Sequence, residues 1–331
     1  MNIIDLVLNV AILFIMMIPG VIMKRGKLSS DTFGKGVSNL VLYIAQPCLI
    51  VYAYLSTDAS FGEIWGGCLA TLLLSFVAHS IFAAIAFPAF KRAPDARRRM
   101  LRFTTIFANA AFMGIPLIEA VIPDPTAVIY ASIYNITFNL FIWTLCVKIC
   151  TGGTEDSSEA EASSESAVSF SKVVIHPVTI AAAVGLLLLI LGINVSTLKR
   201  ANLYVISESL IMLKNLVAPL SMVVIGLRLA DVDLKGLFKD AYMYLFLALR
   251  HLVLPTVTVL AVRLLSLVLP ISETVAFVIA ITSSAPAATS STMFAEKYDC
   301  DAGYVSQLVA VSTLLCIVTM PLIVMLVKAL Y

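Results

Sequence analysis

The chain has 331 residues, of which 60% are apolar and 13% are charged. Soluble globular domains have about 45–50% apolar and about 25% charged residues, so the composition excludes a water-soluble fold. A mean hydropathy of +1.00 over the whole length leaves room for about ten membrane-spanning helices. The net charge of +2 provides no basic face for a phosphate backbone, and we expect no nucleic-acid partner.

Charge clusters and turn residues divide the chain into ten apolar segments. We expect all ten to be helices that cross the lipid bilayer, because a lipid-exposed backbone must satisfy its own hydrogen bonds. The segments cover residues 3–23, 36–56, 64–90, 100–122, 126–149, 173–193, 203–227, 237–268, 271–295 and 303–328. The sequence therefore predicts an all-α integral membrane protein.

The segment from Thr151 to Ser171 differs from the rest of the chain, since it holds five acidic residues among seven serines. This composition predicts a solvated cytoplasmic linker. Sixteen of the 22 Lys and Arg residues fall in alternate loops, beginning with the loop after the first segment. Because such residues accumulate in cytoplasmic loops, we expect a multi-pass protein of the cell membrane with both termini outside.

The linker separates two sets of five segments, residues 1–150 and 172–331, with 151–171 between them. Pro47 lies 69 residues before Pro116, and Pro219 lies 67 residues before Pro286, so the halves resemble each other. Two five-helix repeats must cross the bilayer in opposite senses, which is the inverted repeat of secondary transporters. The alternative is coincidence among the thirteen prolines.

The fourth and ninth segments each contain residues that interrupt a helix. Asn109-Ala-Ala-Phe-Met-Gly114-Ile-Pro116 predicts a break in the fourth, because Pro116 removes a backbone donor and Gly114 relaxes the chain. A run of hydroxyl residues around Pro286 predicts the counterpart in the ninth. Two such breaks meeting near the bilayer midplane would leave helix ends free to bind a substrate. The alternative is a pair of ordinary proline kinks repaired by hydroxyl groups.

Several strings along the chain resemble one family. NAAFMGIPL in the fourth segment and FAEKYDCDAGYVSQLVAVSTLLCIVTMPL at the end are similar to the auxin efflux carrier family, which includes plant PIN-type auxin exporters and bacterial malate and malonate carriers. Arg250-His-Leu-Val-Leu-Pro255 and Gln46-Pro47 add to the resemblance, which covers all ten segments.

The resemblance implies a scaffold of helices 1, 2, 6 and 7 and a transport unit of helices 3–5 and 8–10, with a homodimer formed through the scaffold. It implies that the broken fourth and ninth helices cross at their prolines. Asn109 matches an asparagine of the family's motif there, and Pro116 and Pro286 match its two prolines. Ala287-Ala288 and the hydroxyl residues depart from the more apolar plant sequences.

We therefore predict a secondary transporter that moves small organic anions, dicarboxylates such as malate or malonate or auxin-like carboxylates, by alternating access. A membrane receptor or sensor without net transport is the alternative. We expect no enzyme, because the sequence has no HExxH, GxSxG or Walker A motif. The predicted substrate-binding residues are Asn109, Gly114, Pro116, Asn135, Asn139, Ser284, Pro286 and Thr289.

Other polar residues in the apolar segments have two possible roles. Asn135 and Asn139 share a helix face and could line the site or join helices. Arg250 could balance a carboxylate substrate, or pair with Glu208 or with free carbonyls. Glu119 is the best-placed carboxylate for proton coupling, or it could lie at the outer interface. We expect no metal and no cofactor, with H⁺ or Na⁺ as a possible coupling ion, or a uniporter driven by the membrane potential as the alternative.

Overall fold

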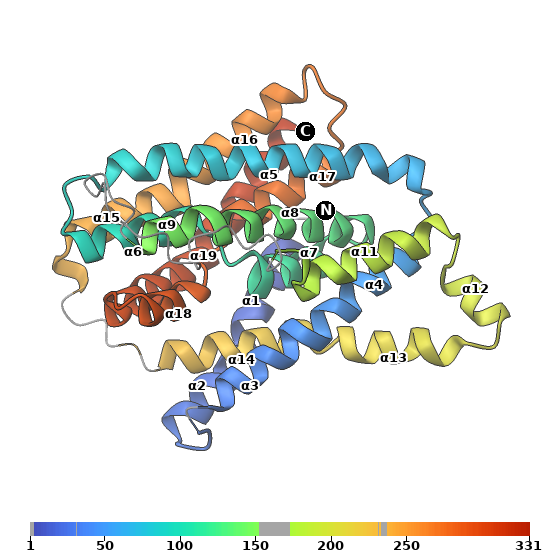
Figure 1. The fold of residues 1–331 in the computed structure, drawn as a ribbon, viewed down its shortest axis with the longest axis horizontal. Helices are drawn as coiled ribbons and strands as arrows, with labels where there is room; N and C mark the ends of the chain where they lie inside the picture. Colours follow the sequence, from blue (N-terminus) through green and yellow to red (C-terminus); the bar gives the residue numbers. More distant parts are fainter. Residues whose placement is uncertain (1–2, 31, 152–172, 231, 233–236) are drawn as a thin grey trace, which may run out of the picture.

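The computed structural model describes all residues except 1–2, 31, 152–172, 231 and 233–236, and these described residues are predominantly helical (Figure 1). The predicted linker lies outside them, apart from Thr151. The α-helices of the first half are α1 (Ile3–Ile15), α2 (Ile18–Arg25), α3 (Phe33–Leu40), α4 (Gln46–Ser56), α5 (Phe61–Ala89), α6 (Asp95–Ile106), α7 (Ile115–Val121), α8 (Thr126–Phe141) and α9 (Val147–Cys150). Those of the second half are α11 (Pro177–Ile190), α12 (Val195–Arg200), α13 (Tyr204–Lys214), α14 (Val217–Ala230), α15 (Ala241–Ala248), α16 (Leu254–Leu265), α17 (Glu273–Ser284), α18 (Ser290–Lys297) and α19 (Ala302–Leu330).

Seven helical stretches in the described part of the chain are long and apolar enough to cross a membrane. They cover Val7–Arg25, Phe33–Ser56, Phe61–Ala89, Thr126–Cys150, Tyr204–Ala230, Ala241–Leu265 and Ala302–Leu330. Three apolar helices are shorter, Ala110–Val121, Pro177–Ile190 and Glu273–Ser284. Each of these stretches overlaps one predicted segment, and the seven long ones confirm an integral membrane protein.

Helices far apart in the sequence pack against one another. α2 packs against α14, and α4 packs against α11 and α13. A second set of contacts joins α5 to α6 and α8, and α17 to α8, α16 and α19. α12 and the start of α5 lie at one end of the molecule, and α6, α9 and α18 lie toward the other (Figure 1).

Three proline residues follow widened turns of helix. The π-helical turns η1 (Val41–Ala45), η2 (Ala110–Gly114) and η5 (Leu249–Val253) each end two residues before a proline, at Pro47, Pro116 and Pro255. A proline ring clashes with the carbonyl four residues earlier, and a π turn relieves this clash by adding a residue to the turn. A fourth π turn, η3 (Ile142–Cys146), has no such proline.

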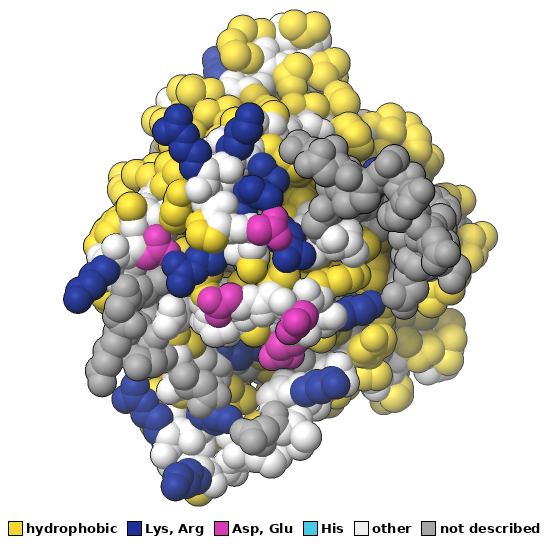
Figure 2. Space-filling view, turned by 60° about the vertical axis from the view of Figure 1, so that its left-hand side comes forward, with side chains coloured by type: hydrophobic (Ala, Val, Ile, Leu, Met, Phe, Trp, Pro, Cys, Tyr) yellow, Lys and Arg dark blue, Asp and Glu magenta, His cyan; other side chains and the backbone are white. Residues whose placement is uncertain are grey.

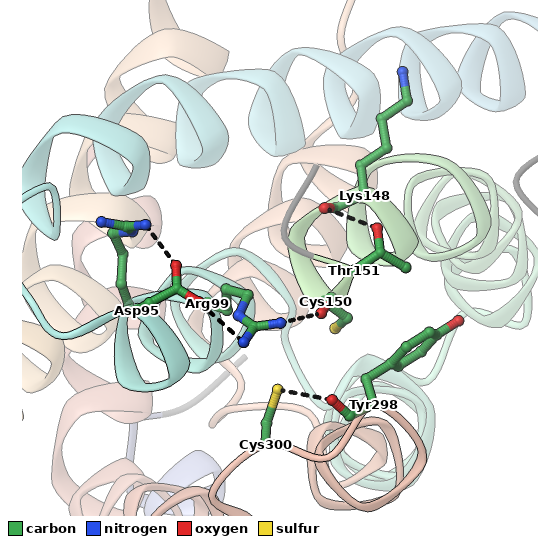
Figure 3. A network of polar contacts seen from close by, with 8 residues as sticks. Asp95, Arg99, Lys148, Cys150, Thr151, Tyr298 and Cys300 are labelled. Atoms are coloured by element: carbon green, nitrogen blue, oxygen red, sulfur yellow. Dashed lines mark hydrogen bonds and ion pairs between the residues drawn. The ribbon is translucent and has the colours of Figure 1, made fainter. Parts of the chain in front are cut away.

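The end of the molecule that carries α6 is rich in Lys and Arg, with Asp and Glu among them (Figure 2). Asp95 binds Arg98 at 2.6 Å and Arg99 at 3.0 Å. Arg99 also donates to the carbonyl of Cys150 at 2.8 Å, at the end of α9 (Figure 3). This network ties the start of the fourth helical segment to the end of the fifth, immediately before the predicted linker.

Candidate functional site

The fourth helical segment is interrupted, but earlier than we predicted. α6 ends at Ile106, and Phe107 and Asn109 lie outside helical geometry before η2 begins at Ala110. Gly114 and Pro116 lie inside the helical stretch that follows, rather than at the break. The physical reason is the π turn of η2, which accommodates Pro116 without ending the helix.

The ninth helical segment is interrupted at its proline, as predicted. α17 ends at Ser284, and Ala285 is extended with φ −58° and ψ 151°. α18 begins at Ser290, so Pro286 lies within the break itself. Pro116 and Pro286 therefore do not hold equivalent positions, although both of their helices are interrupted.

The two interruptions meet. Ala108 and Ala287 form an isolated antiparallel β-bridge. The amide of Asn109 donates to the carbonyl of Pro286 at 2.7 Å, and the amide of Ala288 donates to that of Phe107 at 2.9 Å. We call residues 107–109 and 285–289 together the crossover. All of its side chains for which a burial is given are buried.

Arg250, in η5, reaches the crossover from the eighth helical segment. Its guanidinium donates to Ser283 O at 2.7 Å, to Ala285 O at 2.7 and 3.1 Å, and to Thr105 O at 3.2 Å. The side chain is completely buried. Of the partners that the sequence left open, the structure places free carbonyls around Arg250, and Glu208 is exposed on α13.

The next residue, His251, supports the same break through a hydroxyl group. Its Nε2 lies 2.8 Å from Ser312 Oγ, and its Nδ1 lies 3.0 Å from Thr319 Oγ1, both on α19. Ser312 Oγ also accepts from the amide of Ala287 at 2.9 Å. The buried His251 is therefore a hydrogen-bonded core histidine that helps to hold an amide of the interrupted chain.

Gln46, the first residue of α4, binds a carbonyl of η2, the turn that follows the crossover in the fourth helical segment. The π turn of η2 directs the amide of Ile115 to Ala110 O, so that Ala111 O would need the amide of Pro116, which has none. Gln46 Nε2 donates to Ala111 O at 2.5 Å instead. The Gln46 side chain is completely buried, and its Oε1 has no partner in the described structure.

The predicted polar residues at the crossover differ in how fully they are bonded. Asn109 is 4% exposed, and its Nδ2 has no hydrogen-bond partner within the described residues. Ser284 Oγ donates to Ile281 O of its own helix at 3.2 Å. The carbonyl of Thr289 accepts from Arg228 of α14 at 2.6 Å. Gly114 faces Thr282, because a Cβ built on it would lie 3.6 Å from the Thr282 Cγ2.

Of the remaining predicted residues, the side chains of Asn139 and Glu119 have partners outside the crossover. Asn139 Nδ2 donates to Asn135 O at 2.9 Å within α8, and Asn135 Nδ2 has no partner in the described structure. Glu119 of α7 binds Lys214 of α13 at 2.6 Å. Asn135, Asn139 and Glu119 therefore have no hydrogen bond to the crossover in the described part of the chain.

Sequence reasoning missed Ser312 and Arg228 as neighbours of the crossover. Ser312 is one hydroxyl in an apolar run, and Arg228 falls at the end of its segment, where a cytoplasmic loop begins. Neither has a local signal for this position. No group of His, Cys, Asp or Glu that could hold a metal ion is found among the residues that the structure describes.

The comparison with protein families matches one model, described as membrane transport protein, over residues 5–324. Among curated proteins, none matches the chain. The matched range includes both interrupted helices and Arg250. The chain therefore belongs to the auxin efflux carrier family of membrane transport proteins.

Proposed function

We propose that this membrane transport protein is a secondary carrier of small organic anions, with its substrate site at the crossover. The observation that carries the proposal is the unequal bonding of the broken helix ends. Arg250 binds carbonyls at the ends of α6 and α17, whereas the buried Asn109 Nδ2 has no partner in the described structure. A buried donor without an acceptor is costly, so an anionic ligand is favoured there.

The class of anion follows from the surroundings of the site. The positive charge of Arg250 and the amide of Asn109 favour a carboxylate, and the hydroxyl of Ser284 offers a neutral contact beside them. We therefore propose small carboxylates as substrates, namely dicarboxylates such as malate or malonate, or auxin-like acids. Asn135 and Asn139 are proposed as a further polar wall, because α8 packs against α17 and η2.

We propose alternating access as the mechanism, with ten membrane-crossing helices in two inverted repeats, residues 1–150 and 172–331. The packing of α2 and α4 against α11, α13 and α14 supports a scaffold of helices 1, 2, 6 and 7. The contacts of α5, α6, α8, α16, α17 and α19 support a transport unit that carries the crossover. We further propose a homodimer through the scaffold, which cross-linking in native membranes would test.

We propose the orientation of the protein in the membrane from the distribution of its Lys and Arg residues. The basic end in Figure 2 would face the cytoplasm, because Lys and Arg accumulate in cytoplasmic loops. Both termini would then lie on the outer side of the cell membrane. Labelling of single cysteines by an impermeant reagent tests this: a cysteine in place of Asn202 should react from outside, and one in place of Arg98 should not.

Flux of radiolabelled malonate and malate into proteoliposomes tests the proposed function directly. We expect saturable uptake by the wild type and little uptake by Asn109→Leu, which removes the unpartnered amide without adding charge. Imposing H⁺, Na⁺ and voltage gradients one at a time identifies the coupling. Saturable binding without any flux would contradict a carrier and favour a sensor. An unchanged rate in Asn109→Leu would exclude the proposed site.

A further inference from the structure

The first of the carbonyls that bind Arg250 has lost its helical partner. In an α-helix, each carbonyl accepts from the amide four residues later, so Thr105 O would accept from Asn109. The amide of Asn109 donates instead to Pro286 O, in the other interrupted chain. Arg250 Nη1 donates to the freed Thr105 O at 3.2 Å and so replaces a helical hydrogen bond of the fourth helical segment.

The ninth helical segment shows the same replacement. Ser283 O would accept from the amide of Ala287, but that amide donates to Ser312 Oγ. Ala285 has already left helical geometry, which exposes its carbonyl as well. Arg250 Nη2 donates to both Ser283 O and Ala285 O at 2.7 Å. One side chain therefore replaces the missing partners in both halves of the crossover.

Among the described residues, no ion pair includes Arg250, so its charge has no acidic partner there. The ring of Phe82 is also close, with its centroid 5.5 Å from the guanidinium carbon. A guanidinium stays protonated in proteins, and a buried charge needs compensating dipoles. The three carbonyls supply these dipoles and leave one positive charge fixed at the crossover.

A sodium ion bound to the carbonyls of Thr105, Ser283 or Ala285 would compete with Arg250 for these oxygens. Unwound backbone carbonyls are the usual ligands of coupling ions in broken-helix transporters. The neighbouring hydroxyls of Thr282, Ser283 and Ser284 each donate to a carbonyl of α17. The guanidinium thus fills the place that a bound cation would take.

We propose that Arg250 is the resident cation and positioning residue of the crossover, which holds both interrupted chains in place so that a carboxylate binds there without Na⁺. This inference rests on the proposed function and specifies how that site is assembled. Arg250 acts through the backbone carbonyls of Thr105, Ser283 and Ala285, with no contact to the anion required.

Chemical rescue of Arg250→Ala tests the proposal. The variant should bind radiolabelled malonate at least about tenfold more weakly than the wild type, because it loses several charge-assisted hydrogen bonds. Millimolar guanidinium chloride should restore most of the binding, whereas urea, which has a similar shape and no charge, should not. Choline chloride controls for ionic strength. The matched variant Arg263→Ala, at the exposed end of α16, should bind malonate normally.

Wild-type affinity in Arg250→Ala would overturn the proposal, and so would equal rescue by urea and guanidinium. If the wild type binds no carboxylate, the proposed function fails. The inference about Arg250 can then still be tested by measuring the unfolding temperature. The unfolding temperature of Arg250→Ala should then rise with guanidinium and not with urea, and no such rise would overturn the inference.

If Arg250→Ala does not fold, further measurements still test the proposal. In the wild type, replacing sodium by choline in the assay buffer should leave the malonate affinity within about twofold, and a loss of about tenfold or more would overturn the resident-cation role. Arg250→Lys keeps the charge but not the planar fork, and it should bind malonate more weakly than the wild type without acquiring a sodium requirement.

Discussion

Lys214 Nζ lies 2.6 Å from Glu119 Oε1, and this ion pair joins α13 to α7, the helix that follows the crossover. The two side chains are 17% and 25% exposed, so water screens the pair only partly. The ammonium also lies 5.3 Å from the ring centroid of Tyr52 on α4. In the proposed mechanism, the pair links the scaffold to the transport unit.

Glu119→Gln should lower the free energy of unfolding by about 1–2 kcal/mol, because it leaves a partly buried Lys214 without its carboxylate. Lys214→Met should have a similar effect, and the double variant should show less than the sum, as expected for two groups in contact. Glu208→Gln on the exposed face of α13 is the matched control. Chemical unfolding in detergent measures the stability of all four variants. Additive effects of the two single changes would contradict an interaction between Glu119 and Lys214.

Ser312→Ala should destabilise the protein by about 1–3 kcal/mol, since it leaves the buried amide of Ala287 and a ring nitrogen of His251 without their partner. Ser306→Ala, on the same helix, is the control. Its hydroxyl donates to a carbonyl of its own helix, Ala302 O at 2.8 Å, so its loss should cost about 0.5 kcal/mol or less. Equal effects of the two changes on thermal unfolding would show that Ser312 does not support the crossover.

Asn109→Asp should weaken carboxylate binding by about tenfold or more. The substitution preserves shape but replaces the unpartnered Nδ2 donor by a carboxylate oxygen, which repels an anion. Asn202→Asp, at an exposed position between α12 and α13, should leave binding unchanged. Equilibrium binding of radiolabelled malonate measures both, and unchanged or tighter malonate binding by Asn109→Asp would contradict an anion site at Asn109.

The positions of the helices could be predicted because hydrophobicity alone determines them. Each predicted segment overlaps an apolar helical stretch, and the two interrupted helices were found from their prolines and polar residues. The position of a break could not be predicted in the same way. Pro286 lies in its break, whereas Pro116 lies in a helix that a π turn adjusts. Whether a proline breaks or widens a helix depends on partners such as Gln46, which lies far away in the sequence.

The partners of the candidate site were least predictable. Arg250 stands out in the sequence as a charge inside an apolar segment, but its three carbonyl partners exist only because the chain is interrupted twice. Ser312 is ordinary in sequence and becomes important only because α19 passes beside the break. The sequence therefore identifies charges that need partners, and the tertiary fold decides what those partners are.

Gly226→Ala should destabilise the protein by about 1–3 kcal/mol, because the helices of the proposed scaffold meet at this glycine. A Cβ at Gly226 would lie 2.0 Å from the carbonyl oxygen of Met17, so the first helical segment would have to move away from α14. Gly66→Ala is the matched control, since a Cβ there meets nothing within 4 Å, and it should stabilise α5 by up to about 1 kcal/mol. Thermal unfolding in detergent measures both substitutions. A Gly226→Ala variant as stable as the wild type would mean that α14 and the first segment do not approach as closely as described.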